Sequence, residues 1–302
     1  MAWGLITYQD SGRREDLLDV LGDVSPDETP LITLFGTSTA KGTLHEWLEY
    51  NVSRPTSVSA DVEGAETTFA DLTAPSRVNN ITQIIKQSVQ VSRTERRVNV
   101  AAVGDPYAFQ KADALRQLKM KMEYALLNAA KASGASGTAR QMDGIDTFIT
   151  TVVTARNSGT SFSETELNDM TADAYTTVRA DKVFDTLLCT VKIKQAIAGF
   201  SGNSTRYIDA SERRLIKEIL VYDSAVGSHK VLHHRDVRNS AGSTTVYGIR
   251  EELHKVAYLD KPMFEELAKV GDSDRGHWVT EFTHEAIEER ADVKRTGYNQ
   301  SG

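Results

Sequence analysis

The stretch HEAIEER, residues 284–290, comes closer than any other in this sequence to a metal-binding motif. A zinc protease places two histidines four residues apart on a helix, with a glutamate after the first as general base. His284 and Glu285 fit the first half, but Glu288 stands where the second histidine is needed. On a strand, His284 and Glu288 would lie ~13 Å apart at ~3.3 Å per residue, too far to share one ion. We therefore expect the charged end of a strand here, and an incidental His-Glu pair.

No other group of residues predicts catalysis, a cofactor or a metal site. The sequence lacks the phosphate-binding G-x-x-x-x-G-K-[ST], the dinucleotide-binding G-x-G-x-x-G and the nucleophile motif G-x-S-x-G. His233 and His234 are adjacent on a predicted strand, so they should point to opposite faces. Cys189, the single cysteine, lies in an apolar run and is expected to be a buried small side chain. We predict no enzymatic activity, no cofactor and no metal.

Composition and charge restrict the function further. The 302 residues are 40% hydrophobic and 25% charged, which is typical of a globular protein. We expect no membrane span, no signal peptide and, with one cysteine, no internal disulfide. Residues 1–50 carry nine acids against three bases, whereas residues 77–131 carry ten bases against four acids. This asymmetry favours an acidic segment docking on a basic surface or a basic face turned to a polyanion, unless both are ordinary solvated faces.

Two polar segments have too few apolar residues to form a core of their own. Residues 1–42 contain one short helical pattern, REDLLDVL at 14–21, followed by prolines and glycines. Strand-like alternation in residues 43–52 and 78–91 flanks the polar segment 53–76. So long a polar connection within a compact domain usually has a function, and we predict a long projecting hairpin.

The clearest predicted helix covers residues 105–133. Asp105 is a good N-cap and Pro106 suits the first helical position. Its single apolar stripe predicts a helix of ~42 Å, at 1.5 Å per residue, that lies on a sheet.

From residue 163 onward the pattern indicates an α/β part. Its predicted elements are a helix after a Ser163–Glu166 capping box, strands at 183–189, 217–223, 230–233, 246–249 and 256–259, and short helices at 193–200 and 263–270.

Several stretches, taken in their order along the chain, resemble a known family. They are REDLLDVLGDVSPDETPLITLFG (14–36), LHEWLEY (44–50), RVNNITQI with VSRTER (77–96), GDPYAFQKADALRQLKMKMEYALL (104–127), ARQMDGI (139–145) and YLDKPMFEELAKVGDSDRG (258–276). The chain resembles the major capsid proteins of tailed bacteriophages with the Hong Kong 97-like fold. The resemblance implies an α+β fold with an N-terminal arm at 1–42, an E-loop hairpin at 43–98, a peripheral domain with a spine helix at 99–160, an axial α/β domain at 161–244 and a return to the peripheral domain at 245–302.

The resemblance also implies a function. Copies would form pentamers and hexamers of an icosahedral shell around phage double-stranded DNA, assembled in the bacterial host cytoplasm. Scaffolding and portal proteins, with decoration proteins as a further candidate, would be partners, and DNA would be contacted non-specifically. The candidate intersubunit residues are Asp16, Asp19, Asp23, Glu46, Trp47, Arg77, Arg93, Arg96 and Arg97. An encapsulin-like shell of the same fold is an alternative, and a soluble enzyme of unidentified chemistry is a weaker one.

Overall fold

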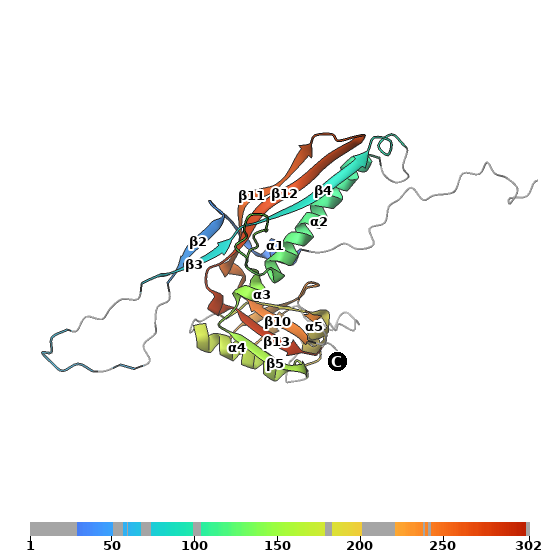
Figure 1. Cartoon of the computed structure of the whole chain (residues 1–302). Coiled ribbons are helices and arrows are strands. Elements are labelled where there is room, and N and C mark those ends of the chain that lie inside the picture. The colour runs from blue at the N-terminus through green and yellow to red at the C-terminus, as the bar shows by residue number, and fades with distance from the viewer. Residues whose placement is uncertain are drawn as a thin grey trace, which may run out of the picture.

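The computed structural model describes residues 29–50, 57–58, 60–67, 74–98, 104–178, 183–200, 221–237, 239–240 and 243–299. These residues form an α+β structure in which a long, narrow sheet, a second broader sheet and a small projecting hairpin meet near one point (Figure 1). The helices are α1 (Pro30–Leu34), α2 (Pro106–Asn128), α3 (Ile145–Phe148), α4 (Glu164–Val178) and α5 (Val191–Ala198), with short 3-10 helices η2 (Glu251–Leu253) and η3 (Glu289–Ala291). No helix in this part of the chain is long and apolar enough to cross a membrane.

The long sheet has the strand order β1-β11-β12-β4. Its strands are β1 (Gly36–Thr39), β4 (Gln83–Ser92), β11 (His254–Leu267) and β12 (Ser273–Ala286). β11 and β12 form an antiparallel pair, β4 continues the sheet on the far side of β12, and β1 lies parallel to β11. The helix expected at 263–270 is wrong, because β11 continues through those positions to Leu267. Pairing with β12, and the packing of Phe264 on Trp278 at 5.3 Å between ring centroids, outweigh the local helical pattern.

Helix α2 lies along β4 on one face of this sheet, as expected (Figure 1). It begins as predicted, with the Asp105 carboxylate accepting a hydrogen bond from the Tyr107 N–H at 3.0 Å. It ends at Asn128, before the expected end at residue 133. The next residue is extended, and its carbonyl accepts hydrogen bonds from Gly144 N and Thr147 Oγ1 instead of continuing the helix. The buried side of α2 packs with α1 and the sheet in one core, whose members include Leu31, Leu118, Met122, Leu126 and Phe282.

The broader sheet has the order β5-β13-β10-β6-β8-β7, with β9 paired to β10. Its strands are β5 (Val153–Thr160), β6 (Thr186–Cys189), β7 (Val221–Asp223), β8 (Ser228–His233), β9 (Asn239–Ser240), β10 (Ser243–Ile249) and β13 (Val293–Tyr298). A second core joins it to α4 and α5. The strands expected at 183–189, 230–233 and 246–249 fall within or overlap this sheet, whereas residues 217–220 of the strand expected at 217–223 lie outside the described residues.

The sheets divide the chain differently from the expected domain boundaries. β5 precedes residue 161, and β10 and β13 extend beyond residue 244, yet all three belong to the broader sheet. Strand patterns show that a segment is extended, but not which sheet it joins, so sequence could not place these boundaries.

The expected capping box is only half formed. Glu166 N donates to Ser163 Oγ at 3.4 Å, while the Glu166 carboxylate turns to the buried Arg295 at 3.0 Å.

The expected hairpin is present but shorter than residues 43–98. β2 (Leu44–Glu49) pairs antiparallel with β3 (Ser76–Ile81), and this two-stranded unit projects from the body (Figure 1). The predicted strand at 78–91 is interrupted at Thr82, whose N–H donates to Thr43 O at 2.9 Å. Beyond Thr82 the chain enters the long sheet as β4. The alternating apolar residues of 78–91, which the sequence suggested were one strand, therefore belong to two strands in two different sheets.

Candidate functional site: the projecting hairpin and the junction at its root

The outer face of the hairpin carries exposed apolar side chains. Leu44 and Leu48 lie on this face of β2 and are 50% and 66% exposed. Leu48 stands opposite Arg77 in β3, and the Arg77 guanidinium lies 3.4 Å from the Glu46 carboxylate between the two leucines. An apolar row on a strand normally faces the core of its own domain. Here no described segment of the same chain buries it, so the row is available to another surface.

The inner face of the hairpin packs on the subunit. Trp47 stacks on Phe148 at 6.2 Å and lies 5.6 Å from the ring of His45. His45 Nε2 is 3.1 Å from a Glu285 oxygen, which also accepts a hydrogen bond from Ser38 Oγ at 2.6 Å. Burial acts to raise the pKa of Glu285, but these hydrogen bonds outweigh it, and the pKa is lowered overall. Glu285 therefore acts as an ionised anchor that joins β1, β2 and the end of β12.

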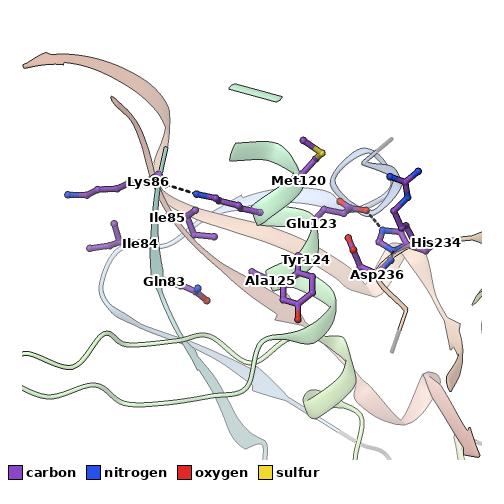
Figure 2. A pocket seen from close by; sticks show the side chains of 12 residues that line it. Gln83, Ile84, Ile85, Lys86, Met120, Glu123, Tyr124, Ala125, His234 and Asp236 are labelled. Atoms are coloured by element: carbon purple, nitrogen blue, oxygen red, sulfur yellow. Dashed lines mark hydrogen bonds and ion pairs between the residues drawn. The ribbon is translucent and has the colours of Figure 1, made fainter. Parts of the chain in front are cut away.

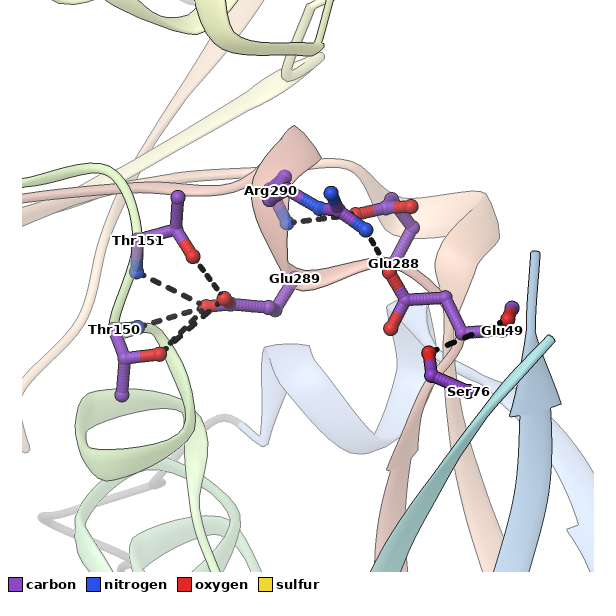
Figure 3. Close-up of polar contacts among 7 residues, drawn as sticks. All are labelled: Glu49, Ser76, Thr150, Thr151, Glu288, Glu289 and Arg290. Carbon is purple, nitrogen blue, oxygen red and sulfur yellow. Dashed lines mark hydrogen bonds and ion pairs between the residues drawn. The ribbon is translucent and has the colours of Figure 1, made fainter. Parts of the chain in front are cut away.

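The residues after β12 connect the hairpin root to the broader sheet (Figure 3). The Arg290 guanidinium binds Glu49 at the end of β2 and Glu288, with 2.7 Å from Arg290 Nε to Glu288. The neighbouring Glu289 accepts hydrogen bonds from the segment before β5, including one of 2.8 Å from Thr150 N. Burial raises the pKa of Glu288, and the charge of Glu49 adds to this despite the attraction of Arg290. We call Glu49, Glu288, Glu289 and Arg290 the root junction.

His284 lies inside this region and not at its surface. Its side chain is fully buried, its ring stacks on His254 at 5.1 Å, and its Nε2 is 2.9 Å from His254 Nδ1. On the other side of His254, Nε2 is 2.9 Å from the buried Asp292 carboxylate. Asn80 Nδ2 donates to the His284 carbonyl at 2.8 Å, which ties β12 to β3. Burial, together with the neighbouring His254, lowers the pKa of His284 well below its usual value.

The expectations for HEAIEER are thus partly confirmed. His284 lies on strand β12, as expected, and Glu288 lies beyond its end. The predicted charged end of a strand is confirmed, since Glu285 lies on β12 and Glu288, Glu289 and Arg290 follow it. The His284 and Glu285 side chains are nevertheless buried and hold neighbouring elements. β12 lies between β11 and β4 and ends where α1, β3 and α3 converge, so its last residues are enclosed. The described residues contain no group of three or more His, Cys, Asp or Glu arranged to hold a metal ion.

The described candidate intersubunit residues fall into two separate places. Glu46, Trp47 and Arg77 belong to the hairpin, with Trp47 turned inward. Arg93 and Arg96 lie just past the far end of β4, where they pair with Asp272 at 3.0 Å and Asp274 at 2.5 Å, and Arg97 is exposed beside them. The N-terminal candidates lie outside the described residues: Asp16, Asp19 and Asp23. Among the described residues, the hairpin candidates and the arginines after β4 therefore lie at two separate places.

Glu123 is a structural anchor that sequence reasoning missed. This buried α2 carboxylate accepts hydrogen bonds from Leu31 N at 2.7 Å and Ile32 N at 3.0 Å, and lies 3.0 Å from His234 Nε2. It therefore joins α1, α2 and the loop after β8. A sequence signal for this burial exists: Leu126 and Leu127 follow Glu123 at the helical spacings of three and four, so Glu123 lies on the apolar side of α2.

His233 is exposed and His234 is buried, in agreement with the prediction that they point to opposite faces.

Comparison with known proteins identifies the family. The model of the family described as SU10 major capsid protein matches residues 5–298. The chain belongs to this family. The chain is 22% identical, over 329 aligned positions, to the major capsid protein of Escherichia phage Phieco32, and the alignment covers 91% of each chain.

Solved structures show the same fold at lower identity. The capsid of Myoviridae phage XM1 matches with a TM-score of 0.64 and 11% identity, covering 94% of this chain and 96% of that one. The holo-SrpI encapsulin complex from Synechococcus elongatus PCC 7942 matches with a TM-score of 0.61 and 11% identity, covering 96% and 94%. The expected Hong Kong 97-like fold is thereby confirmed.

The protein is a phage major capsid protein and a component of the virion capsid. Capsid proteins of this kind assemble into shells with copies of themselves. The protein belongs to a family of structural capsid proteins, and this membership implies a non-enzymatic role. The encapsulin likeness concerns the fold, and the phage assignment is the better supported of the two.

Proposed function

We propose that this major capsid protein builds an icosahedral shell of pentamers and hexamers in which the outer face of the β2–β3 hairpin contacts a neighbouring copy. The observation that carries the proposal is the exposed row of Leu44 and Leu48 on an element that projects from the body. Val58 and Val62, in the connection between the two strands, are 90% and 78% exposed and extend the apolar character. Every subunit in a shell contacts other copies of the same chain, so a neighbouring copy is the partner that we assign to this row.

The energy of such a contact suits reversible assembly. Burying one leucine side chain contributes about 1.5–3 kcal/mol, so a pair of leucines gives a contact that is weak alone. Repetition around a closed shell makes many weak contacts stable together. The ion pair of Arg77 with Glu46, both at the surface, adds at most about 1 kcal/mol but can orient the partner. We assign Glu46, Trp47 and Arg77 to this contact, with Trp47 setting the angle of the hairpin from within.

The fold supports the following assignment of parts. Of the expected N-terminal arm, residues 1–42, the part with α1 and β1 belongs to the long sheet and its core, so we assign the arm to the residues before α1. Of the expected E-loop, residues 43–98, β2 and β3 form the paired root, whereas β4 belongs to the long sheet. The long sheet with α2 corresponds to the peripheral domain (99–160 and 245–302), and the broader sheet to the axial domain (161–244), with β5, β10 and β13 added to it.

We also propose non-specific contact with packaged double-stranded DNA, together with scaffolding, portal and decoration partners and assembly in the bacterial cytoplasm. The basic balance of residues 77–131 motivates the DNA contact. Arg93 and Arg96 are candidates for either DNA or the acidic arm residues Asp16, Asp19 and Asp23. Their pairing with Asp272 and Asp274 inside the subunit reduces the charge they can offer to either.

The hairpin contact is tested by placing a charge on its outer face. Leu48→Asp should leave the subunit folded, because the side chain is exposed, and should reduce the yield of shells at least tenfold. Val191→Asp is the matched control, since Val191 is 54% exposed at the first position of α5, where an acidic residue is favourable. Size-exclusion chromatography with light scattering and negative-stain microscopy measure the outcome. Normal shells from the Leu48→Asp variant would refute the proposed contact.

The content of the purified particles separates the two kinds of shell. Phage-length double-stranded DNA in particles from lysed host cells is the expected result. Particles that contain a defined protein cargo and no DNA would favour an encapsulin-like role over the proposed one.

A further inference from the structure

The direction in which the β2–β3 hairpin projects is decided at one residue, Thr82. β3 belongs to the hairpin and β4 to the long sheet, and Thr82 is the single residue between them. Thr82 is fully buried, and each of its polar groups is held. Its N–H donates to Thr43 O at 2.9 Å, its carbonyl accepts from Arg140 Nε at 2.9 Å, and its hydroxyl donates to Glu281 at 2.5 Å. The chain therefore cannot change direction here without breaking hydrogen bonds.

Asn80, near the end of β3, is held just as firmly. Its side chain is fully buried, and Nδ2 donates to the carbonyls of Asp143 at 3.0 Å and His284 at 2.8 Å. Oδ1 accepts from the backbone N–H groups of Ile81 and Asp143, both at 2.8 Å. These four bonds use both donors and both acceptor positions of a side-chain amide. A buried polar group that is fully satisfied in this way holds its neighbours in one arrangement.

Most of these partners come from the segment 131–143, which lies between α2 and α3. The same segment makes two further contacts with this part of the chain. Lys131 Nζ donates to the backbone carbonyl of Asn79 at 2.9 Å and to its side-chain oxygen at 2.7 Å. Met142 N donates to the side chain of Gln83, the first residue of β4, at 3.4 Å. One segment thus binds the chain on both sides of the point where it leaves the long sheet.

We propose that the segment 131–143 sets the direction of the hairpin, with Asn80 as the positioning residue through which it acts. The inference rests on the proposed contact between the hairpin and a neighbouring copy. Trp47 holds β2 from within the subunit, whereas the segment 131–143 holds β3, so the two strands are fixed from separate places. A hairpin held in this way presents its outer face within a narrow range of angles, and association then costs less ordering entropy.

Two variants weaken this attachment without changing the outer face of the hairpin. Asn80→Ala removes all four hydrogen bonds of the amide, whereas Lys131→Met removes only an exposed contact with β3 and should leave the subunit folded. Lys121→Met is the matched control, because Lys121 is also exposed and binds a strand in the same manner. Its Nζ donates to the Lys86 carbonyl at 3.2 Å (the dashed line beside Lys86 in Figure 2) and to the Gln87 side chain at 2.5 Å, both in β4 and outside the hairpin.

Pulsed electron spin resonance on unassembled full-length subunits measures the direction of the hairpin. One spin label is attached at Leu48→Cys in β2 and the other at Tyr124→Cys in α2, both exposed positions. Native Cys189 should stay unlabelled, because it is buried and its pKa is raised to about 12. We expect a narrow distribution of distances without further substitution and with Lys121→Met. The distribution should be at least twofold wider with Asn80→Ala and should widen by a smaller amount with Lys131→Met.

Shell formation, measured by negative-stain microscopy without the labels, gives the consequence for assembly. Lys131→Met should lower the yield of closed shells severalfold relative to Lys121→Met and give more open or irregular particles. Equal widths for the Lys131→Met and Lys121→Met subunits would overturn the positioning role, and this comparison decides even if Asn80→Ala does not fold. A wider distribution together with normal shells would overturn the link to assembly. The distances come from unassembled subunits, so they test the positioning role even if Leu48→Asp shows that the hairpin contacts no neighbouring copy.

Discussion

Replacing Arg290 by methionine should loosen the root junction in a way that depends on pH. The change removes the cation between Glu49 and Glu288 and leaves an apolar chain of similar length. The side chains of Arg290, Glu49 and Glu288 are 30%, 12% and 22% exposed, so the burial of this cluster is intermediate between that of a surface ion pair and that of a buried one. Surface pairs contribute about 0.2–1 kcal/mol, whereas removing one partner of a buried pair costs about 3–5 kcal/mol. We expect Arg290→Met to lower the free energy of unfolding by about 2 kcal/mol at pH 8.

The sign of the pH dependence follows from Glu288. Its pKa is already raised by burial and by Glu49, and loss of Arg290 removes an attraction that opposes this. A carboxyl with a folded-state pKa above its unfolded value binds a proton more tightly when folded, so stability falls as pH rises through the interval between them. The variant should therefore lose more stability at pH 8 than at pH 5, where one of the two carboxyls is more readily protonated.

Urea unfolding of unassembled full-length subunits at pH 8 and pH 5 measures both effects. Arg290→Lys should fall between the wild type and Arg290→Met, because it keeps the charge but not the two-sided guanidinium contact. A double-mutant cycle with Glu49→Gln should give a coupling of about 1–2 kcal/mol at pH 8. A coupling below about 0.3 kcal/mol, or an equal loss at the two pH values, would refute the argument that Arg290 holds two ionised carboxylates.

Two further predictions concern the broader sheet and the hairpin. Gly297 has φ +99, and a Cβ there would lie 2.1 Å from the Arg156 carbonyl, so Gly297→Ala should cost more than about 3 kcal/mol in urea unfolding. Gly137→Ala shares the positive φ but meets open space, and it should cost only about 1–2 kcal/mol; similar losses for both would contradict the clash. For the hairpin, amide hydrogen exchange in Leu44–Glu49 should slow at least tenfold when subunits form shells, as read by mass spectrometry. Unchanged exchange would show that no neighbour covers β2.

Sequence by itself determined the elements whose signals lie within a few adjacent residues. Asp105 and Pro106 marked the start of α2, because capping and the fixed φ of proline act locally. The two strands around the polar segment 53–76 were recognisable from their alternation, and so was the hairpin they form. The fold family was indicated by the resemblance of several residue stretches, taken in their order along the chain, to a known family.

Only the tertiary structure decided which elements meet and which faces they leave open. Residues 263–267 have a helical pattern but pair with β12, since a long antiparallel partner provides more hydrogen bonds and packing than an isolated helical turn. The alternation in β2 predicted a strand but not its orientation, and the structure leaves Leu44 and Leu48 exposed while Trp47 is turned inward. HEAIEER resembled half of a metal motif, and its actual role depends on residues as distant as Glu49 and Thr150. Such contacts join positions more than a hundred residues apart, and no local pattern encodes them because their energy exists only once the sheets have come together.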